Sequence, residues 1–389
     1  MTADILVPTE DTSAAKALGP PAAAVFLGTL AIGLPMSVLP LFVHGVLSYG
    51  TTVVGIVVGA QSLITLLSRP HAGRFSDKAG PRKAMMFGLV ACSVAGVAYA
   101  VASVLNRGGA LAALLVGRGT LGIAESLLVT GALALGIRRA GPHRSGMVMV
   151  WVGLALFGSF GFGAPVGQVL YSALGLGALA ALVFTTPLIG LVVGARMAPI
   201  APLPHRHVPL KTVLRWVAPA GLSLALSAIG YAAIVSFLPL VIASRAWGSP
   251  GLALAAFAGG FILARLLCAS WPDRLGHRRV AIGFLSLEAA GLVLLWLAPS
   301  EAATLLGAAM AGGGYSISFP ALGIEAIQRV PPENRGVALG TWAAFLDFGL
   351  GVGAPLLGVV AGVAGLQAPF AVGVLGCVAA VGIMLSLGR

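Results

Sequence analysis

The chain contains 389 residues, of which 58% are hydrophobic and only 9% are charged, whereas about a quarter of the residues in a soluble domain are charged. A soluble fold of this length could not bury so much apolar surface, so the composition predicts an integral membrane protein. The net charge of +12 comes without an aromatic–basic patch, so we expect no nucleic-acid partner.

The apolar residues form long runs rather than alternating segments, and the chain has 55 glycines. Transmembrane helices use glycine for close packing, whereas a membrane β-barrel shows short alternating segments. A helical span needs about 20 apolar residues. We therefore predict an all-α membrane protein with twelve transmembrane helices, at residues 18–44, 51–72, 82–105, 109–135, 145–171, 176–197, 213–243, 250–271, 279–298, 302–328, 335–361 and 367–387.

A basic segment that contains Pro202, Pro204, His205 and His207 divides these helices into two sets of six. Clustered prolines are typical of a linker. The predicted regions are an N-terminal tail at 1–17, a six-helix bundle at 18–198, a linker at 199–212 and a second six-helix bundle at 213–389.

The lysines and arginines between the predicted spans lie mostly on one side of the membrane. If both termini are placed on the same side, that side holds all of these residues except Arg107 and Arg245. Basic loops stay in the cytoplasm, so both termini and the linker are predicted to be cytoplasmic. The polar segment before Lys16 lacks a basic n-region and a cleavage site, and we expect no cleaved signal peptide.

A short polar segment interrupts the apolar runs at residues 73–83, with the sequence Gly-Arg-Phe-Ser-Asp-Lys-Ala-Gly-Pro-Arg-Lys. A similar segment, Ala-Ser-Trp-Pro-Asp-Arg-Leu-Gly-His-Arg-Arg, occupies residues 269–279. An offset of 196 residues relates four pairs of positions in these segments: Asp77 and Asp273, Gly80 and Gly276, Arg82 and Arg278, and Lys83 and Arg279. The chain therefore contains an internal duplication.

The duplication extends into the predicted helices. Arg69 is related to Arg265 by the same offset of 196, and Gly-Phe-Gly-Ala-Pro at 161–165 is related to Gly-Val-Gly-Ala-Pro at 351–355 by an offset of 190. Six spans in each half keep the halves in the same orientation. We therefore predict parallel six-helix repeats, related by an axis along the membrane normal.

Twelve spans in two halves, with the pattern Gly-x-x-x-Asp-x-x-Gly-x-Arg-Lys after the second span, resemble the major facilitator superfamily over essentially the whole chain. Residues 118–122 (Arg-Gly-Thr-Leu-Gly) resemble a motif of drug:proton antiporters. Residues 163–167 (Gly-Ala-Pro-Val-Gly) resemble the Gly-Pro antiporter motif, with Ala164 inserted before the proline. Residues 32–35, 67–74 and 319–323 are similar to the bacterial YhhS/YfcJ-like group, often labelled arabinose-efflux-like. The resemblance implies a bacterial cytoplasmic (inner) membrane location.

The polar segment at 73–83 is interpreted as a cytoplasmic latch that closes when the transporter faces outward. Asp77 would accept hydrogen bonds from the amides at a helix N-terminus and pair with Arg82. Gly73 would permit close backbone approach and Gly80 a tight turn. The alternative interpretation is a basic anchor that sets only the topology.

The second copy of the latch contains Asp273, Gly276 and Arg278. It is expected to act less firmly, because Ala269 replaces the first glycine and Pro272 precedes the acid. In the fifth span, Gly163 and Pro165 belong to a glycine-rich face. This face is interpreted as a tight interface between helices that rock, or alternatively as ordinary small-residue packing.

Charged residues inside a span are costly and functional by default. Arg118 and Glu125 are seven residues apart, about two helical turns, so they share a face of the fourth span. Arg118 would bind an anionic substrate or act on a proton-carrying carboxylate, and the alternative is a structural ion pair. Asp347 lies near the middle of the eleventh span beside Trp342 and Phe345. It is a candidate proton carrier, and the alternative is a hydrogen-bonded structural acid.

Other polar residues complete the predicted site. Spans 1, 4, 7 and 10 line the cavity in the resembled family, which implies roles for Tyr231 and Tyr315. His44 in the first span and Gln61 in the second are further candidates, although a lone His is more often a satisfied polar residue. The glycines at 312–314 predict a break or bend before Tyr315, and Glu288 is assigned as a structural partner of Arg265.

We expect a proton-coupled secondary transporter that exports a small molecule by alternating access, with Arg118 as the substrate or coupling base and Asp347 or Glu125 as the proton carrier. The first span lacks the acid that many drug:proton antiporters carry there. The alternative is import of a sugar or an organic anion by uniport or symport. We expect no enzyme activity, cofactor or metal, and a monomer whose partners are substrate, protons and lipid.

Overall fold

The structure, a computed structural model, describes residues 12–141, 144–200, 210–328, 330–331 and 335–387. Most of the predicted linker, and residues 1–11 of the predicted tail, lie outside these ranges. Most of the described residues are helical, and none of them forms a strand. The elements are α1 (Thr12–Gly33), α2 (Val38–Leu41), a π-helical turn η1 (Phe42–Val46), α3 (Thr51–Ala79), α4 (Pro81–Ala102), α5 (Arg107–Ala140), α6 (Ser145–Ala195), α7 (Leu210–Ser244), α8 (Pro250–Cys268), a second π-helical turn η3 (Pro272–Gly276), α9 (His277–Leu297), α10 (Glu301–Gln328), α11 (Arg335–Ala364) and α12 (Ala368–Ser386).

Eleven helical segments of the described chain are long and apolar enough to cross a membrane. The segment in α6 contains two of the predicted spans. A straight helix of its 51 residues would be about 77 Å long, far more than the hydrocarbon thickness of about 30 Å. At Gly175 the backbone leaves the helical region, with φ 77° and ψ −173°. Residues 145–174 and 176–195 are therefore separate spans, and the predicted all-α fold with twelve transmembrane helices is confirmed.

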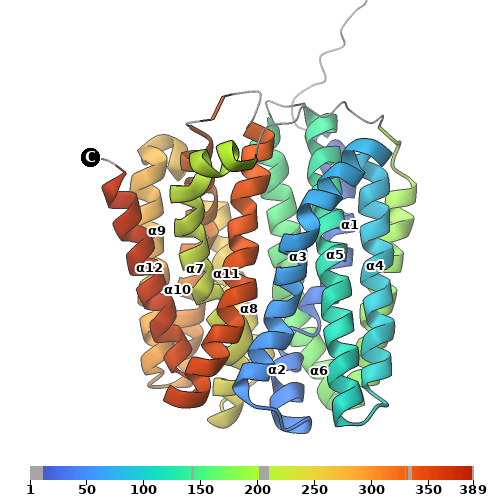
Figure 1. The fold of residues 1–389 in the computed structure, drawn as a ribbon, viewed down its shortest axis with the longest axis vertical. Helices are drawn as coiled ribbons and strands as arrows, with labels where there is room; N and C mark the ends of the chain where they lie inside the picture. Colours follow the sequence, from blue (N-terminus) through green and yellow to red (C-terminus); the bar gives the residue numbers. More distant parts are fainter. Residues whose placement is uncertain (1–11, 142–143, 201–209, 329, 332–334, 388–389) are drawn as a thin grey trace, which may run out of the picture.

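The helices form two groups that meet in the middle of the molecule. In Figure 1 the N-terminal helices, coloured blue to green, lie on one side and the C-terminal helices, coloured yellow to red, on the other. The groups meet mainly where α3 packs against α11 and α6 against α8, with smaller contacts of α2 and α3 with α7. Large apolar side chains such as Val116, Leu266 and Val363 are exposed on the outside. An apolar outer surface of this kind fits contact with lipid rather than water.

Glycines make the close approach between α3 and α11 possible. A Cβ atom on Gly59 would lie 2.9 Å from the carbonyl oxygen of Gly351, and one on Gly358 would lie 2.6 Å from that of Thr51. These distances are too short for a side chain, so the two backbones touch. Small residues are what membrane helices use for such contacts, because helix association in lipid depends on close van der Waals packing.

One end of the helix bundle carries a group of exposed basic side chains, among them Lys78, Lys83, Arg274 and Arg279. We call it the basic end. It is the upper end in Figure 1, where α3 ends and α4 and α9 begin. Its location in the cytoplasm stays a prediction from the charge distribution.

The polar segment at 73–83 is not the loop that the sequence suggested. The helix α3 continues through Pro70 to Ala79, and Gly80 alone separates it from α4. Gly80 has φ 96° and its counterpart Gly276 has φ 90°, so both provide the turn expected of them. The close backbone approach predicted at Gly73 is wrong, because a Cβ atom there would meet nothing within 4 Å.

The tenth span has no break at residues 312–314, and the alternative, a bend there, stays a prediction. α10 remains one helix from Glu301 to Gln328. Its glycines serve close packing instead: a Cβ atom on Gly312 would lie 2.8 Å from the carbonyl carbon of Phe257 in α8, and one on Gly314 would lie 2.6 Å from the carbonyl oxygen of Phe284 in α9.

Candidate transport site

An ion pair joins the two halves of the molecule inside the bundle. Arg69 of α3 binds Asp347 of α11, with the Nε of Arg69 donating to Oδ2 and its Nη2 donating to Oδ1 at 3.2 Å. The carboxylate is buried and the guanidinium is largely buried. Removing one partner of a buried pair costs about 3–5 kcal/mol. This contact therefore opposes separation of α3 from α11 at the position of the ion pair.

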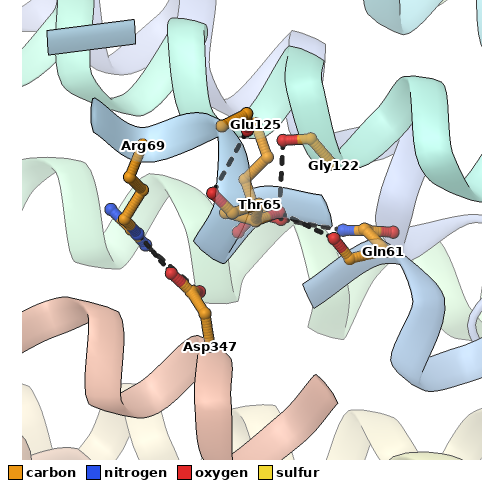
Figure 2. Close-up of polar contacts among 7 residues, drawn as sticks. Gln61, Thr65, Arg69, Gly122, Glu125 and Asp347 are labelled. Atoms are coloured by element: carbon orange, nitrogen blue, oxygen red, sulfur yellow. Dashed lines mark hydrogen bonds and ion pairs between the residues drawn. The ribbon is translucent and has the colours of Figure 1, made fainter. Parts of the chain in front are cut away.

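A second carboxylate contacts α3 at Gln61 and Thr65, the two turns before Arg69. Glu125 of α5 accepts a hydrogen bond from the side-chain amide of Gln61 at 2.8 Å and one from the hydroxyl of Thr65 at 3.4 Å. Thr65 also lies 3.2 Å from the carbonyl oxygen of Gly122. Figure 2 shows Thr65 between Glu125 and the turn that carries Arg69. Two acids and one arginine therefore share a small polar region in an apolar bundle.

Arg118 lies two turns before Glu125 on α5, and the two side chains do not pair. The guanidinium of Arg118 is buried and donates to the backbone carbonyls of Val57 and Val58 on α3, at 3.1 and 2.8 Å. Arg118 thus ties α5 to α3. The sequence pointed to it as the central base, but the inter-half ion pair is made by Arg69.

The aromatic candidates lie in another cluster of the bundle. Tyr231 of α7 and Tyr315 of α10 stack with ring centroids 5.4 Å apart, and both are buried. Phe157 of α6 lies between them and Phe261 of α8, onto which it stacks at 3.8 Å. His44 belongs to neither cluster. It is exposed in η1, where its Nδ1 lies 2.9 Å from the carbonyl oxygen of Tyr49.

The predicted pairing of Arg82 with Asp77 is not what the structure contains. Arg82 donates instead to the carbonyl oxygens of Gly194 and Ala195 at the end of α6, at 3.1 and 2.7 Å. In the second copy, Arg278 donates to the carbonyl oxygen of Leu385 near the end of α12, at 2.7 Å. Both arginines therefore bind within their own half, at the C-terminal ends of helices.

The glycine-rich part of α6 packs against the interrupted first span. A Cβ atom on Gly163 would lie 2.8 Å from the backbone of Gly33 and Leu34, where α1 ends. Ser37 donates to the carbonyl oxygen of Ala164 at 2.8 Å. On the other side, a Cβ atom on Gly251 of α8 would lie 2.7 Å from the Cα of Pro165. This stretch thus packs against both halves.

Two further acids have partners that the sequence did not suggest. Glu288 of α9 was assigned to Arg265, but it accepts from the hydroxyl of Ser227 on α7 at 2.7 Å. Glu325 of α10 pairs with His277 at 2.8 Å.

Among the described residues, no group of three or more His, Cys, Asp or Glu side chains is placed to hold a metal ion.

Sequence reasoning missed Arg69, Thr65 and Arg265 as site residues. Arg69 was placed at the end of a span because the apolar run stops near it, whereas α3 extends to Ala79. The repeated arginines at 69 and 265 were the available signal, since a basic residue kept inside a span in both halves is costly.

Twelve apolar helices in two groups, joined by a buried ion pair, define a polytopic helical membrane protein built from two repeats. A family model described as Major Facilitator Superfamily matches residues 22–219 and again residues 220–388. The chain therefore belongs to the Major Facilitator Superfamily, a family of transporters and not of enzymes.

Related proteins share the sequence over most of their length. An uncharacterised MFS-type transporter of Pseudomonas aeruginosa (strain UCBPP-PA14) is 42% identical over 368 residues, which cover 94% of this chain and 91% of that protein. One of Salmonella typhimurium (strain LT2) is 40% identical over 350 residues, 90% of each chain. The crystal structure of the human organic anion transporter MFSD10 (TETRAN) has a TM-score of 0.74 at 17% identity, covering 96% of this chain and 100% of that one. This last likeness concerns the fold alone.

Proposed function

We propose that the protein exports a small molecule across the bacterial cytoplasmic membrane by proton-coupled alternating access, as a monomer of the YhhS/YfcJ-like group. Both termini would lie in the cytoplasm, and the bundles at 18–198 and 213–389 would rock about a midplane site. The observation that carries the proposal is the Arg69–Asp347 pair, because it joins the two halves through a group that can bind a proton.

Asp347 is the proposed proton carrier. While it is ionised, the pair with Arg69 holds α3 against α11. When a proton binds the carboxylate, the negative charge is lost and Arg69 no longer has a counter-ion there. In a low-dielectric interior an unpaired guanidinium is unfavourable, so protonation favours a state in which Arg69 has another partner.

Glu125 is the proposed second partner. It lies beside Thr65, which is one turn before Arg69 on α3, and its hydrogen-bond donor Gln61 is neutral, so it can accept Arg69 without losing an existing ion pair. Moving Arg69 from Asp347 to Glu125 transfers the contact from between the halves to within one half. The two halves could then separate, and loss of the proton from Asp347 would restore the original pair.

The test is a distance measurement between the halves at the basic end. Spin labels at Lys83→Cys and Arg279→Cys, both exposed, would report this distance after replacement of Cys92, Cys268 and Cys377. We expect acidification to change the distance distribution, and Asp347→Asn to give the acidic distribution at alkaline pH. Glu301→Gln, an acid outside the network, is the matched control and should keep the response. A wild-type distribution insensitive to pH would overturn the proposal.

Import of a sugar or an organic anion remains the alternative direction. In proteoliposomes containing labelled carboxylates and sugars, a proton gradient directed inward should drive solute out if the protein is an antiporter. Uptake under the same gradient would indicate symport, and movement indifferent to the gradient would indicate uniport.

A further inference from the structure

The charged network has a counterpart in the other half of the repeat. The offset of 196 between α3 and α8 relates Arg69 to Arg265, and the offset of 190 between α6 and α11 relates Asp347 to Phe157. The structure supports these offsets independently. Gly122 of α5 packs against the carbonyl oxygen of Gln61, and Gly312 of α10 packs against that of Phe257. These residues are also related by 190 and 196.

The same relation places an aromatic residue at each of the two acidic positions. Glu125 corresponds to Tyr315, again at an offset of 190, and Asp347 corresponds to Phe157. The arginine is kept while both carboxylates are replaced. The equivalent region in the second half is therefore an arginine surrounded by aromatic rings rather than an ion-pair network.

Arg265 is buried without a protein anion. It is 7% exposed, and its guanidinium carbon lies 5.1 Å from the ring centroid of Phe261. Among the residues that the structure describes, it makes no hydrogen bond and no ion pair. A buried guanidinium that lacks an anion is unfavourable, and a cation–π contact offsets only part of that cost.

A second polar group in the same cluster also lacks a partner. Tyr315 is 1% exposed, and its hydroxyl has no hydrogen-bond partner among the described residues. The next residue, Ser316, donates to the carbonyl oxygen of Phe261 at 2.7 Å, one turn before Arg265 on α8. The ring of Tyr315 stacks on Tyr231 and lies 6.2 Å from Phe157. An unused cationic donor and an unused hydroxyl donor are thus placed beside flat apolar surfaces.

We propose that Arg265, Tyr315, Tyr231, Phe157 and Phe261 form the substrate subsite, and that it takes an aromatic monocarboxylate. The carboxylate pairs with Arg265 and accepts the hydroxyl of Tyr315, while the ring stacks among the aromatic side chains. This inference rests on the proposed transport function, for which it names the substrate class. The two ion-handling tasks are then divided between two regions that the repeat relates, with protons at the network of α3, α5 and α11 and the organic anion at the cluster of α8, α10 and α6.

Ligand binding to the purified full chain tests the proposal without any requirement for proton coupling. The probes are 2-naphthoate and its neutral analogue 2-naphthamide, and the readout is the rise in unfolding temperature with ligand concentration. We expect 2-naphthoate to bind about ten- to a hundredfold more tightly, because a hydrogen bond to a charged group is worth more than one to a neutral group. Arg265→Gln should reduce the affinity for 2-naphthoate to that for 2-naphthamide, whereas exposed Arg274→Gln should not change it.

A pair of variants at Phe157 provides a test that keeps Arg265 in place. Phe157→Asp would give Arg265 the acid that Arg69 has, so it should abolish 2-naphthoate binding while the unfolding temperature is kept or raised. Phe157→Asn removes the same ring without adding the charge, so it should weaken binding but keep the preference for 2-naphthoate over 2-naphthamide. The proposal is overturned if 2-naphthoate does not stabilise the wild type, if Arg265→Gln binds it equally well, or if the two Phe157 variants behave alike. Asp347→Asn should still bind 2-naphthoate, although the distance between its two halves no longer changes with pH. This result would show that the subsite is separate from the coupling step.

Discussion

Arg82 of α4 and Arg278 of α9 make the same kind of contact in the two halves of the protein. Arg82 donates to the carbonyl oxygens of Gly194 and Ala195 at the end of α6, and Arg278 donates to that of Leu385 near the end of α12. The last carbonyls of a helix have no partner within it and carry partial negative charge. Each arginine therefore attaches the first turn of one helix to the last turn of another helix in its own half.

Arg82→Gln is expected to destabilise the protein without moving the halves. The loss of two hydrogen bonds from a charged donor to a helix end should cost about 1–3 kcal/mol, seen as a lower unfolding temperature in detergent. Exposed Lys83→Gln is the matched control and should change little. A change in the distance between the basic ends of the halves, with stability unaltered, would instead support the latch interpretation of this motif.

The turn between α3 and α4 gives a sharper comparison. Gly80 has φ 96° and ψ 147°, a region that essentially only glycine adopts and that costs a residue with a Cβ atom about 1–3 kcal/mol, so Gly80→Ala should lower the unfolding temperature. Gly73→Ala, seven residues earlier in α3 and with open space around it, should be neutral or stabilising by up to about 1 kcal/mol. If both variants lost stability equally, the positive φ at Gly80 would not be the cause.

The pair of Arg69 with Asp347 should show strong coupling in a double-mutant cycle. Arg69→Gln leaves both Asp347 and Glu125 without a positively charged neighbour. We expect the free energy of unfolding to fall by about 3–5 kcal/mol. Asp347→Asn should cost less, because Glu125 is available to Arg69. The double variant should lose less unfolding free energy than the sum of the two single losses. Its two halves should no longer move in response to protons. Additive losses in unfolding free energy would mean that the two residues do not interact.

Periodicity and repeats were enough to predict the spans, because a membrane helix is encoded by a local run of apolar residues. The ends of helices were harder. The polar residues after Ala72 were taken as the end of the second span, whereas α3 continues to Ala79, so Arg69 lies well before the end of the helix. A helix near the basic end can hold charged residues in its last turns, and apolar content alone does not mark where it stops.

The site itself was predicted only in part. Asp347 and Glu125 were identified by the cost of placing an acid in a span, and Gln61 does contact Glu125. The partner of Asp347 was not found, because Arg69 is 278 residues away in sequence and meets it only where the two halves touch. Such a contact depends on how the repeats pack, which no local pattern encodes.

The α6 helix packs closely against the end of α1 at Gly163. A Cβ atom on Gly163 would lie 2.8 Å from the backbone of Gly33 and Leu34, and backbone atoms cannot rotate away. Gly163→Ala should therefore cost about 1–3 kcal/mol through overpacking. It should also open a path for ions along α6, measured as proton entry into liposomes loaded with a pH-sensitive dye. Gly153→Ala, in the same helix with nothing within 4 Å of the new atom, should leave both stability and leak unchanged. A leak that rose equally in both variants would point to loss of helix flexibility rather than to this contact, because alanine stiffens the helix at either position while only residue 163 touches α1.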